Sequence, residues 1–185
     1  LLIVEQYKTI KRDKTSHKGT FGNLLIVGGW NGMLGAANLC GLAALRSGVG
    51  KVYLCSNKTQ KRSNEIISVS TSLNSLKPIM KKINAVVIGP GLGKNAYDII
   101  NYLWNTSKPL LIDADGLIWL SKNFIKKRKA TTIFTPHPGE AKKLIKNKVI
   151  DRLKTIHDLK NKYGGIWILK GAGTLILNNR LYVNN

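Results

Sequence analysis

Short apolar runs alternate with longer amphipathic segments along most of the chain. This pattern predicts the strands of a mostly parallel sheet with helices on both faces. The predicted strands are 24–28, 51–55, 85–88, 109–112, 131–134, 166–169 and 174–177. The predicted helices are 34–47, 96–105, 139–146 and 149–163.

The segment 58–82 has the weakest pattern, because it carries Ser and Thr among isolated apolar residues. We predict a helix followed by a short strand there. The chain has 185 residues, of which 43% are apolar, so it can bury a core and has the size of one domain.

The formal charge is +21, from 30 Lys and Arg against 9 Asp and Glu. Such a charge would usually suggest a polyanionic partner, and a basic nucleic-acid-binding protein is one alternative. The basic residues are spread along the whole chain, however, and only 126–129 forms a block. That block follows a short helical stretch and precedes a strand, which favours a solvated surface loop. We expect no specific nucleic-acid partner.

The chain begins without methionine and ends just after an apolar stretch, so both ends are expected to be cut from something longer. No apolar run approaches the ~18 residues that span a bilayer, and the first segment carries charges in place of a signal-peptide core. The sequence therefore predicts a soluble, cytoplasmic protein with no membrane partner. Cys40 and Cys55 lie in apolar stretches and are expected to be reduced core thiols.

Five polar loops each follow directly on a predicted strand. In an open parallel sheet, the loops that leave the carboxyl ends of the strands line the ligand crevice. We therefore expect these loops to outline one site. They are 28–29, 89–93, 113–116, 135–140 and 170–174.

The glycines of 28–37 allow a ligand to approach the backbone, and the helix that follows offers free N–H groups to an anion. A tight turn with close helix packing explains the same residues equally well. The segment is not a Walker A loop, since no Gly-Lys-Ser/Thr follows. The loop 89–93 is not the dinucleotide fingerprint, because Lys94 stands in the place of its third glycine.

Asp113 and Asp115 end one predicted strand, where two carboxylates suit Mg²⁺ or a substrate hydroxyl. One of the two is expected to be a structural cap. His137 is held between two prolines and is well placed to hydrogen-bond a ligand, although a lone histidine is usually structural. Glu140 begins the next predicted helix, where a carboxylate also favours the helix dipole.

The segment 170–174 combines a cation, two flexible peptides and a hydroxyl. These groups suit a phosphate or a ribose phosphate. The same residues also suit the turn of a β-hairpin, and both interpretations are compatible with one geometry.

Taken together, these motifs resemble the ribokinase-like NAD(P)H-hydrate dehydratase family, in particular the C-terminal domain of the bifunctional bacterial hydrate repair enzymes. The resemblance runs from about Ser16 to the end of the chain. The segments that carry it are 16–19, 21–22, 32–37, 43–48, 89–93, 113–115, 135–140 and 169–174.

The resemblance implies a ribokinase-like three-layer α/β/α domain over 16–185, with its C-terminal part missing. It leaves 1–15 as a leading segment or linker from a preceding epimerase domain. The implied reaction is dehydration of the 6S hydrate of NADH or NADPH at the expense of ADP or ATP, with Mg²⁺, by phosphorylation of the hydrate hydroxyl and loss of phosphate. The resemblance does not distinguish ADP from ATP, and it leaves a homo-oligomer open.

The resemblance also assigns roles to residues of this sequence. Ala36, Gly91 and His137 would contact the hydrated coenzyme, and Glu140 would lie near Mg²⁺. The adenine nucleotide would be bound by Lys170, Gly171, Ala172, Gly173 and Thr174. Further candidates for the site are Asp113, Asp115 and Gly93.

Two departures from the family pattern limit these expectations. Family members continue into a Gly-x-Gly-Asp segment, whose helix start holds the phosphate and whose aspartate activates the substrate hydroxyl. The 185 residues contain no such segment, and no Asp or Glu follows Asp158. We therefore expect this chain alone to be inactive, and a catalytic residue is not assigned. Ile118 stands where relatives often carry Asn.

Two further alternatives stay open at this point. One is a catalytically dead domain that still binds nucleotide. The other is a different ribokinase-like kinase, for a hydroxymethylpyrimidine, thiazole or sugar substrate.

Overall fold

The computed structural model describes residues 11–30, 32–57, 63–93, 96–123, 126–146, 149 and 151–184. Its strands are β1 Asn23–Val27, β2 Lys51–Cys55, β3 Ile66–Val69, β4 Ala85–Ile88, β5 Leu110–Ile112, β6 Thr132–Phe134, β7 Ile166–Leu169, β8 Thr174–Leu177 and β9 Leu181–Asn184. Its helices are α1 Leu34–Arg46, α2 Leu73–Ile79, α3 Tyr97–Trp104, α4 Asp115–Lys122, α5 Pro138–Ile145 and α6 Arg152–Tyr163.

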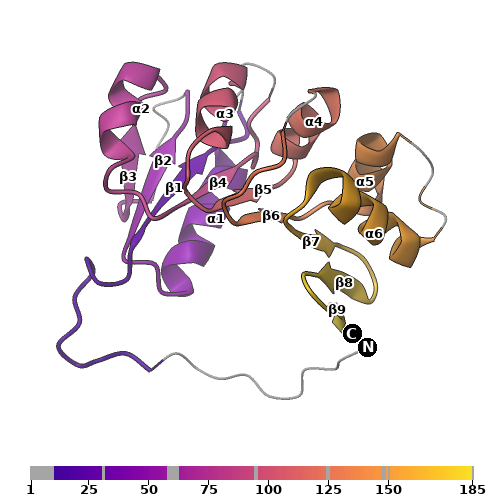
Figure 1. Ribbon diagram of the computed structural model, residues 1–185. Helices are drawn as coiled ribbons and strands as arrows, with labels where there is room; N and C mark the ends of the chain where they lie inside the picture. The colour runs from indigo at the N-terminus through magenta and orange to yellow at the C-terminus, as the bar shows by residue number, and fades with distance from the viewer. Residues whose placement is uncertain are drawn as a thin grey trace.

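The strands form a single sheet in the order β3-β2-β1-β4-β5-β6-β7-β8-β9 (Figure 1). All pairings from β3 to β7 are parallel, and β8 and β9 add an antiparallel meander at one edge. The carboxyl ends of seven neighbouring strands therefore lie at the same edge of the sheet, which is where the polar loops begin.

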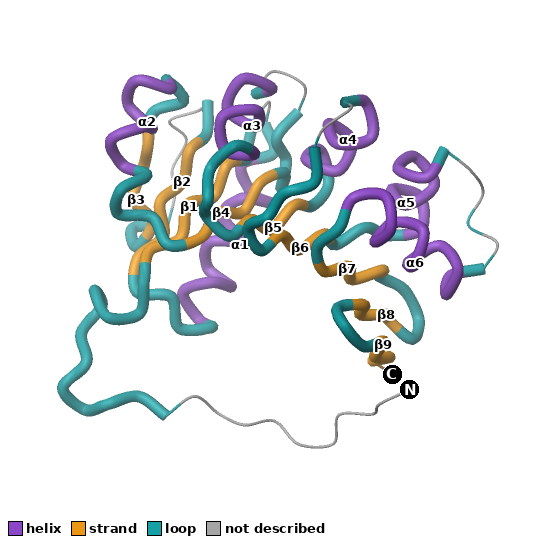
Figure 2. The backbone as a smooth tube through the Cα atoms, viewed as in Figure 1, coloured by secondary structure: helices purple, strands orange, loops and turns teal. Residues whose placement is uncertain are grey.

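Alternate residues of each strand point to opposite faces of the sheet and build two cores. Helices α2 to α6 pack on one face, over residues such as Ile88, Ile112 and Trp167, which are fully buried. Helix α1 lies on the opposite side (Figures 1 and 2) and covers a smaller core that includes Ile26 and Val52. The mostly parallel, three-layer α/β/α architecture predicted from the sequence is confirmed.

The predicted elements agree with the structure to within a residue or two at most ends. Helix α6 is an exception, because it begins at Arg152 and not at 149. Asp151 caps it, and its carboxylate accepts hydrogen bonds from the N–H groups of Leu153 and Lys154.

The prediction for 58–82 was wrong in its order: strand β3 comes first and helix α2 follows. Residues 58–62 lie outside the described residues. Strand β3 is at the edge of the sheet and buries only two of its four side chains, so its apolar signal is weak. Pro78 near the end of α2 weakens the helical signal in the same way.

Three smaller findings complete the fold. Helix α4 and strand β9 were not among the predicted elements. Of the predicted leading segment 1–15, only 11–15 is described, and Arg12 there donates a hydrogen bond to the Gly48 carbonyl at 2.9 Å. Within the described part of the chain, no helix has the length and apolar character needed to cross a bilayer.

Candidate functional site

The loops after β1 and β4 pack directly against each other at the carboxyl edge of the sheet. The N–H groups of Gly29 and Trp30 donate to the carbonyls of Pro90 and Gly91 at 2.9 and 2.6 Å. A side chain at Gly28 would overlap the Pro90 carbonyl. The absence of a side chain at Gly28 is therefore required by the contact between the two loops, whether or not a ligand approaches there.

The loops after β4 and β5 are joined in the same way. Gly89 has a φ of +123°, and a side chain there would overlap the Asp113 carbonyl. The Asp115 carboxylate accepts a hydrogen bond from the Gly93 N–H at 2.8 Å. Because Asp115 is the first residue of α4, it ties the start of that helix to the loop 89–93. Its carboxylate thus has a structural task.

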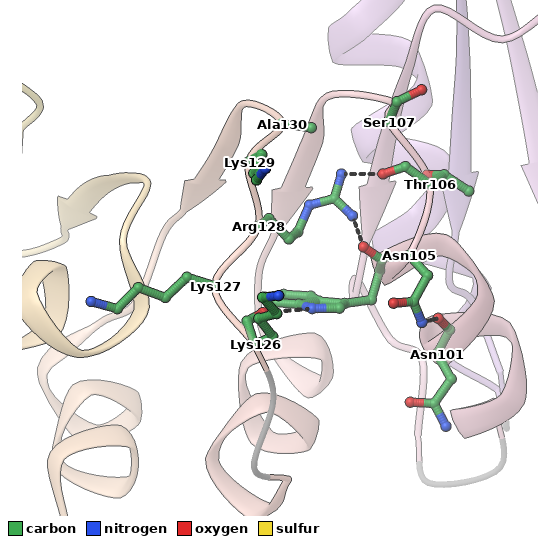
Figure 3. A pocket seen from close by; sticks show the side chains of 10 residues that line it. Asn101, Asn105, Thr106, Ser107, Lys126, Lys127, Arg128, Lys129 and Ala130 are labelled. Atoms are coloured by element: carbon green, nitrogen blue, oxygen red, sulfur yellow. Dashed lines mark hydrogen bonds between the residues drawn. The ribbon is translucent and has the colours of Figure 1, made fainter.

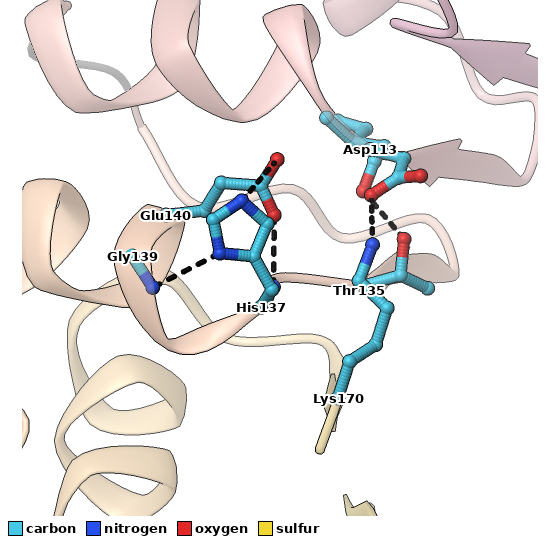
Figure 4. Close-up of polar contacts among 7 residues, drawn as sticks. Asp113, Thr135, His137, Gly139, Glu140 and Lys170 are labelled. Carbon is cyan, nitrogen blue, oxygen red and sulfur yellow. Dashed lines mark hydrogen bonds and ion pairs between the residues drawn. The ribbon is translucent and has the colours of Figure 1, made fainter.

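Asp113 has a different environment, in which its carboxylate meets a cation. Lys170, at the end of β7, places its Nζ 2.9 Å from Oδ1 of Asp113 (Figure 4). The two side chains reach each other across β6, which lies between β5 and β7. Both are partly exposed, at 30% for Asp113 and 42% for Lys170, so the pair is open to a ligand.

The negative charge of Asp113 also acts on Cys40 of α1. Burial, together with the negative charge of Asp113, raises the pKa of the Cys40 thiol above its ordinary value. Cys40 is therefore a protonated thiol at neutral pH. Within the described part of the chain, neither Cys40 nor Cys55 forms a disulfide bond.

His137 and Glu140 form a capping box at the start of α5. The His137 Nδ1 accepts a hydrogen bond from the Gly139 N–H at 3.0 Å, and the Glu140 Oε2 accepts one from the His137 N–H at 2.8 Å (Figure 4). Because Nδ1 is an acceptor, the neutral imidazole carries its proton on Nε2. The His137 Nε2 lies 3.6 Å from Glu140 Oε1. The His137 side chain is 57% exposed, so its Nε2–H can donate a hydrogen bond to a ligand.

Arg152 organises the segment 170–174 from the first turn of α6. Its guanidinium donates to the carbonyls of Ala172 at 2.6 Å, Gly173 at 3.0 Å and Leu169 at 3.2 Å. The sequence interpretation did not find this residue. One signal was available: a cation in the first turn of a helix opposes the helix dipole, so it is expected to have another partner.

The predicted site residues follow one another along the sheet edge. Ala36, in the first turn of α1, and Gly91 lie near each other, since a side chain at Gly91 would come within 2.6 Å of Met33. His137 follows β6, two strands away from the loop of Gly91, or about 10 Å at ordinary strand spacing. The loop that begins at Lys170 lies one strand further on. The structure thus arranges these residues as a row.

The described residues contain no group of three or more His, Cys, Asp or Glu side chains that would hold a metal ion. Glu140, the residue expected near Mg²⁺, already uses Oε2 in the capping box and has only Oε1 left. Magnesium commonly binds through one or two carboxylates together with substrate phosphates. The residues present therefore suit a magnesium ion that is bound mainly by nucleotide phosphates.

A pocket of about 480 Å³ lies at the opposite edge of the sheet, at the amino ends of β5 and β6 (Figure 3). Arg128 lines it and donates to the backbone carbonyls of Leu103, Trp104, Thr106 and Lys108. Burial lowers the pKa of its guanidinium. In the basic block 126–129, the lysines are exposed as predicted, but Arg128 is a structural residue and not part of a solvated loop.

A second pocket, of about 330 Å³, lies beside the site at the carboxyl edge. It is lined by Trp30, Thr71, Ser72, Leu73, Asn74, Ala96, Asp98 and Ile99. Trp30 connects it to the site through its hydrogen bond to Gly91. The sequence interpretation assigned no role to these residues.

Comparison with known proteins identifies the class to which this fold and site belong. A family model described as NAD(P)H-hydrate dehydratase matches residues 24–185. The chain therefore belongs to the NAD(P)H-hydrate dehydratase family, as the resemblance in its motifs implied.

Individual relatives agree with this assignment. The bifunctional NAD(P)H-hydrate repair enzyme of Coxiella burnetii is 38% identical over an alignment of 178 positions that covers 90% of this chain and 36% of that protein. The ADP-dependent (S)-NAD(P)H-hydrate dehydratase of Neisseria meningitidis is 34% identical over an alignment of 190 positions that covers 94% of this chain and 64% of that protein. The chain thus spans about a third of the bifunctional relative and less than two thirds of the second.

Solved structures show the same fold. An ADP/ATP-dependent NAD(P)H-hydrate dehydratase from Bacillus subtilis, co-crystallised with ATP/Mg²⁺, superposes with a TM-score of 0.75 at 28% identity and covers 94% of this chain and 67% of that one. A ribokinase-like superfamily protein from Enterococcus faecalis reaches a TM-score of 0.85 at 24% identity, covering 95% of this chain and 66% of that one. The ribokinase-like fold predicted from the sequence is confirmed.

Proposed function

We propose that this chain forms most of the active site of an enzyme that dehydrates the 6S hydrate of NADH or NADPH at the expense of ADP or ATP. The observation that carries the proposal is the row of site residues along one sheet edge. Positions for the hydrated coenzyme lie at one end of the row and a glycine-rich loop for the nucleotide lies at the other. The ion pair between Asp113 and Lys170 joins the middle of the row to the nucleotide loop.

The row separates the expected coenzyme positions from the nucleotide loop by several strands. Ala36 and Gly91 lie by β1 and β4, and the loop after β7 lies three strands beyond β4, about 14 Å away at ordinary strand spacing. His137 lies between them and presents its Nε2 proton. The coenzyme would therefore extend along the edge from α1 toward His137, with its reacting hydroxyl near Asp113 and Lys170.

The proposed reaction has two steps. The hydrate hydroxyl gives its proton to a base, its oxygen forms a bond to the terminal phosphorus of the nucleotide, and the bond from that phosphorus to the nucleotide oxygen breaks. The carbon–oxygen bond of the hydrate then breaks and phosphate leaves, while the neighbouring carbon loses a proton and the ring double bond returns. Phosphate is a much better leaving group than hydroxide, so a kinase-like site can drive a dehydration.

The chain's own residues contribute mainly charge and position to this reaction. Lys170 is placed to neutralise charge on the transferred phosphoryl group, since it already binds a carboxylate at hydrogen-bond distance. Mg²⁺ bound to the nucleotide would supply further neutralisation, and Oε1 of Glu140 is the carboxylate oxygen of the capping box that remains for it. His137 would orient the coenzyme through its Nε2 proton.

The test is an assay of the protein expressed from its whole reading frame with purified hydrate. We expect the absorbance of the reduced nicotinamide to recover only when ADP or ATP and Mg²⁺ are both present. Lys170→Met should lower the rate by about 100-fold or more, as expected for loss of a phosphoryl-binding charge. Lys127→Met is the matched control, because Lys127 is an exposed lysine at the opposite edge of the sheet. Recovery of the coenzyme without nucleotide would contradict the proposal.

A further inference from the structure

Three carbonyl groups of the nucleotide loop accept hydrogen bonds from protein side chains. Arg152 binds the carbonyls of Leu169, Ala172 and Gly173, and the Thr174 hydroxyl binds the carbonyl of Gly171 at 2.9 Å. A short loop whose carbonyls are held on one side presents its N–H groups on the other. Arg152 is thus the residue that fixes which face of the backbone is free.

Three consecutive N–H groups in the middle of this loop have no protein acceptor among the described residues, whereas that of Lys170 donates to the Pro136 carbonyl at 2.9 Å. Within the described part of the chain, the N–H groups of Gly171, Ala172 and Gly173 donate to no backbone or side-chain oxygen. Gly171 and Ala172 are exposed, and Gly173 is left-handed, with a φ of +60°. Successive free N–H groups around a left-handed residue form a concave site for an anion.

The charge of Arg152 points to the same kind of ligand. Among the described residues, no carboxylate lies within ion-pair distance of its guanidinium, and its buried Nε has no hydrogen-bond partner. A guanidinium that binds only neutral carbonyls keeps its positive charge uncompensated. Beneath a loop of free N–H groups, this charge strengthens the attraction for an anion on the opposite side.

We propose that Arg152 is a positioning residue for the nucleotide phosphates: by binding the loop carbonyls it holds the N–H groups of Gly171 to Gly173 in the orientation that receives a phosphate. This inference rests on the proposed use of the loop for nucleotide binding. Arg152 itself lies on the other side of the loop from the ligand and does not touch the phosphate.

The test compares ADP with adenosine, because only ADP carries the phosphates. Arg152→Lys and Arg152→Ala should each weaken ADP binding by about 10–100-fold in calorimetry, as expected for loss of hydrogen bonds to a charged group. Adenosine affinity should change by less than about threefold, since lost positioning of the N–H groups affects the phosphates alone. Millimolar methylguanidinium should restore part of the ADP affinity of Arg152→Ala.

The matched control is Arg128→Lys. Arg128 also binds a set of backbone carbonyls, but at the opposite edge of the sheet. Its substitution should lower the unfolding midpoint in urea and leave ADP affinity unchanged. Wild-type ADP affinity in both Arg152 variants, or an equal loss for ADP and adenosine, would overturn the inference alone. Failure of the unsubstituted protein to bind ADP would overturn the proposed function as well.

Discussion

Gly89 and Gly171 each follow a parallel strand at the same edge of the sheet, and both have positive φ angles, but their surroundings differ. The α-carbon of Gly89 lies against the Asp113 carbonyl, so its missing side chain makes room for the neighbouring loop. Gly171 is exposed, and the nearest atom to a side chain there would be Nη2 of Arg152, at 3.2 Å. Similar glycine-rich sequences thus produce a packed loop in one place and an open one in the other.

The contrast between the packed and the open loop distinguishes loops that stabilise the fold from the loop that faces the expected ligand. The loops after β1, β4 and β5 satisfy one another's N–H groups, including that of Gly93 through Asp115. In the loop after β7, the carbonyls of Gly171 to Gly173 accept hydrogen bonds, and the N–H groups of the same three residues have no acceptor within the described part of the chain. A rigid set of packed loops beside one open loop is an arrangement that positions a substrate and binds an anion next to it.

The largest expected effect is that of Gly89→Ala. The added methyl group would overlap a backbone carbonyl and would sit at a φ of +123°, so strain and overpacking together should lower the free energy of unfolding by about 3 kcal/mol or more. Gly173→Ala, at a φ of +60° in the open loop, should lower it by only about 1–2 kcal/mol. Urea unfolding of both variants measures the contrast.

Gly35→Ala is the control for this pair. It lies in the first turn of α1 at the same edge, and a side chain there would have no atom within 4 Å. It should raise the free energy of unfolding by up to about 1 kcal/mol. A loss for Gly89→Ala no larger than that for Gly173→Ala would show that the two loops do not differ as described.

The next effect separates the two aspartates. Asp115→Ala removes the acceptor for the Gly93 N–H and a carboxylate from the first turn of α4, so it should lower the free energy of unfolding by about 1–2 kcal/mol. Asp113→Ala removes a partly exposed ion pair and should lower it by no more than about 1 kcal/mol. The reverse order in urea unfolding would make Asp113 the structural residue of the two.

The strands were predictable because each is a short apolar run. Seven of these runs, such as 85–88 and 166–169, lie close to the strands observed. The strand predicted within 58–82 was placed after the helix and not before it, because the run Ile66–Val69 is interrupted by Ser68 and lies among other Ser and Thr residues. Strand β9 was missed because its residues are only partly buried and its last one is exposed.

The loops of the site could also be placed from the sequence, since parallel topology alone brings them to one edge. Their internal contacts could not. Whether Asp113 or Asp115 is the structural carboxylate depends on which way each side chain turns at the end of β5. Arg152 meets the loop 170–174 only because α6 packs on β7 and β8, a contact that no local pattern encodes.

The smallest expected effect uses Cys40 as a reporter of Asp113. Burial is the main cause of the raised Cys40 pKa, and the charge of Asp113 adds to it. Asp113→Asn should therefore lower this pKa only in part and speed alkylation of Cys40 by iodoacetamide, near pH 8, by less than about tenfold. Asp115→Asn is the matched control and should leave the rate unchanged, while Cys40→Ser gives the background from Cys55.

The same pKa fixes the direction of a pH effect on stability. The folded pKa of Cys40 lies above the ordinary value of 9.0, so the folded state favours the neutral thiol. The contribution of this group to stability is fully present below pH 9.0 and is lost as the pH rises through the folded pKa. In Asp113→Asn the pKa of Cys40 in the folded state moves back toward its value in the unfolded state. Raising the pH above 9.0 should therefore cost this variant less stability than the wild type. Equal alkylation rates in the wild type and Asp113→Asn, with the fold intact by circular dichroism, would place Asp113 too far from Cys40 to act on it.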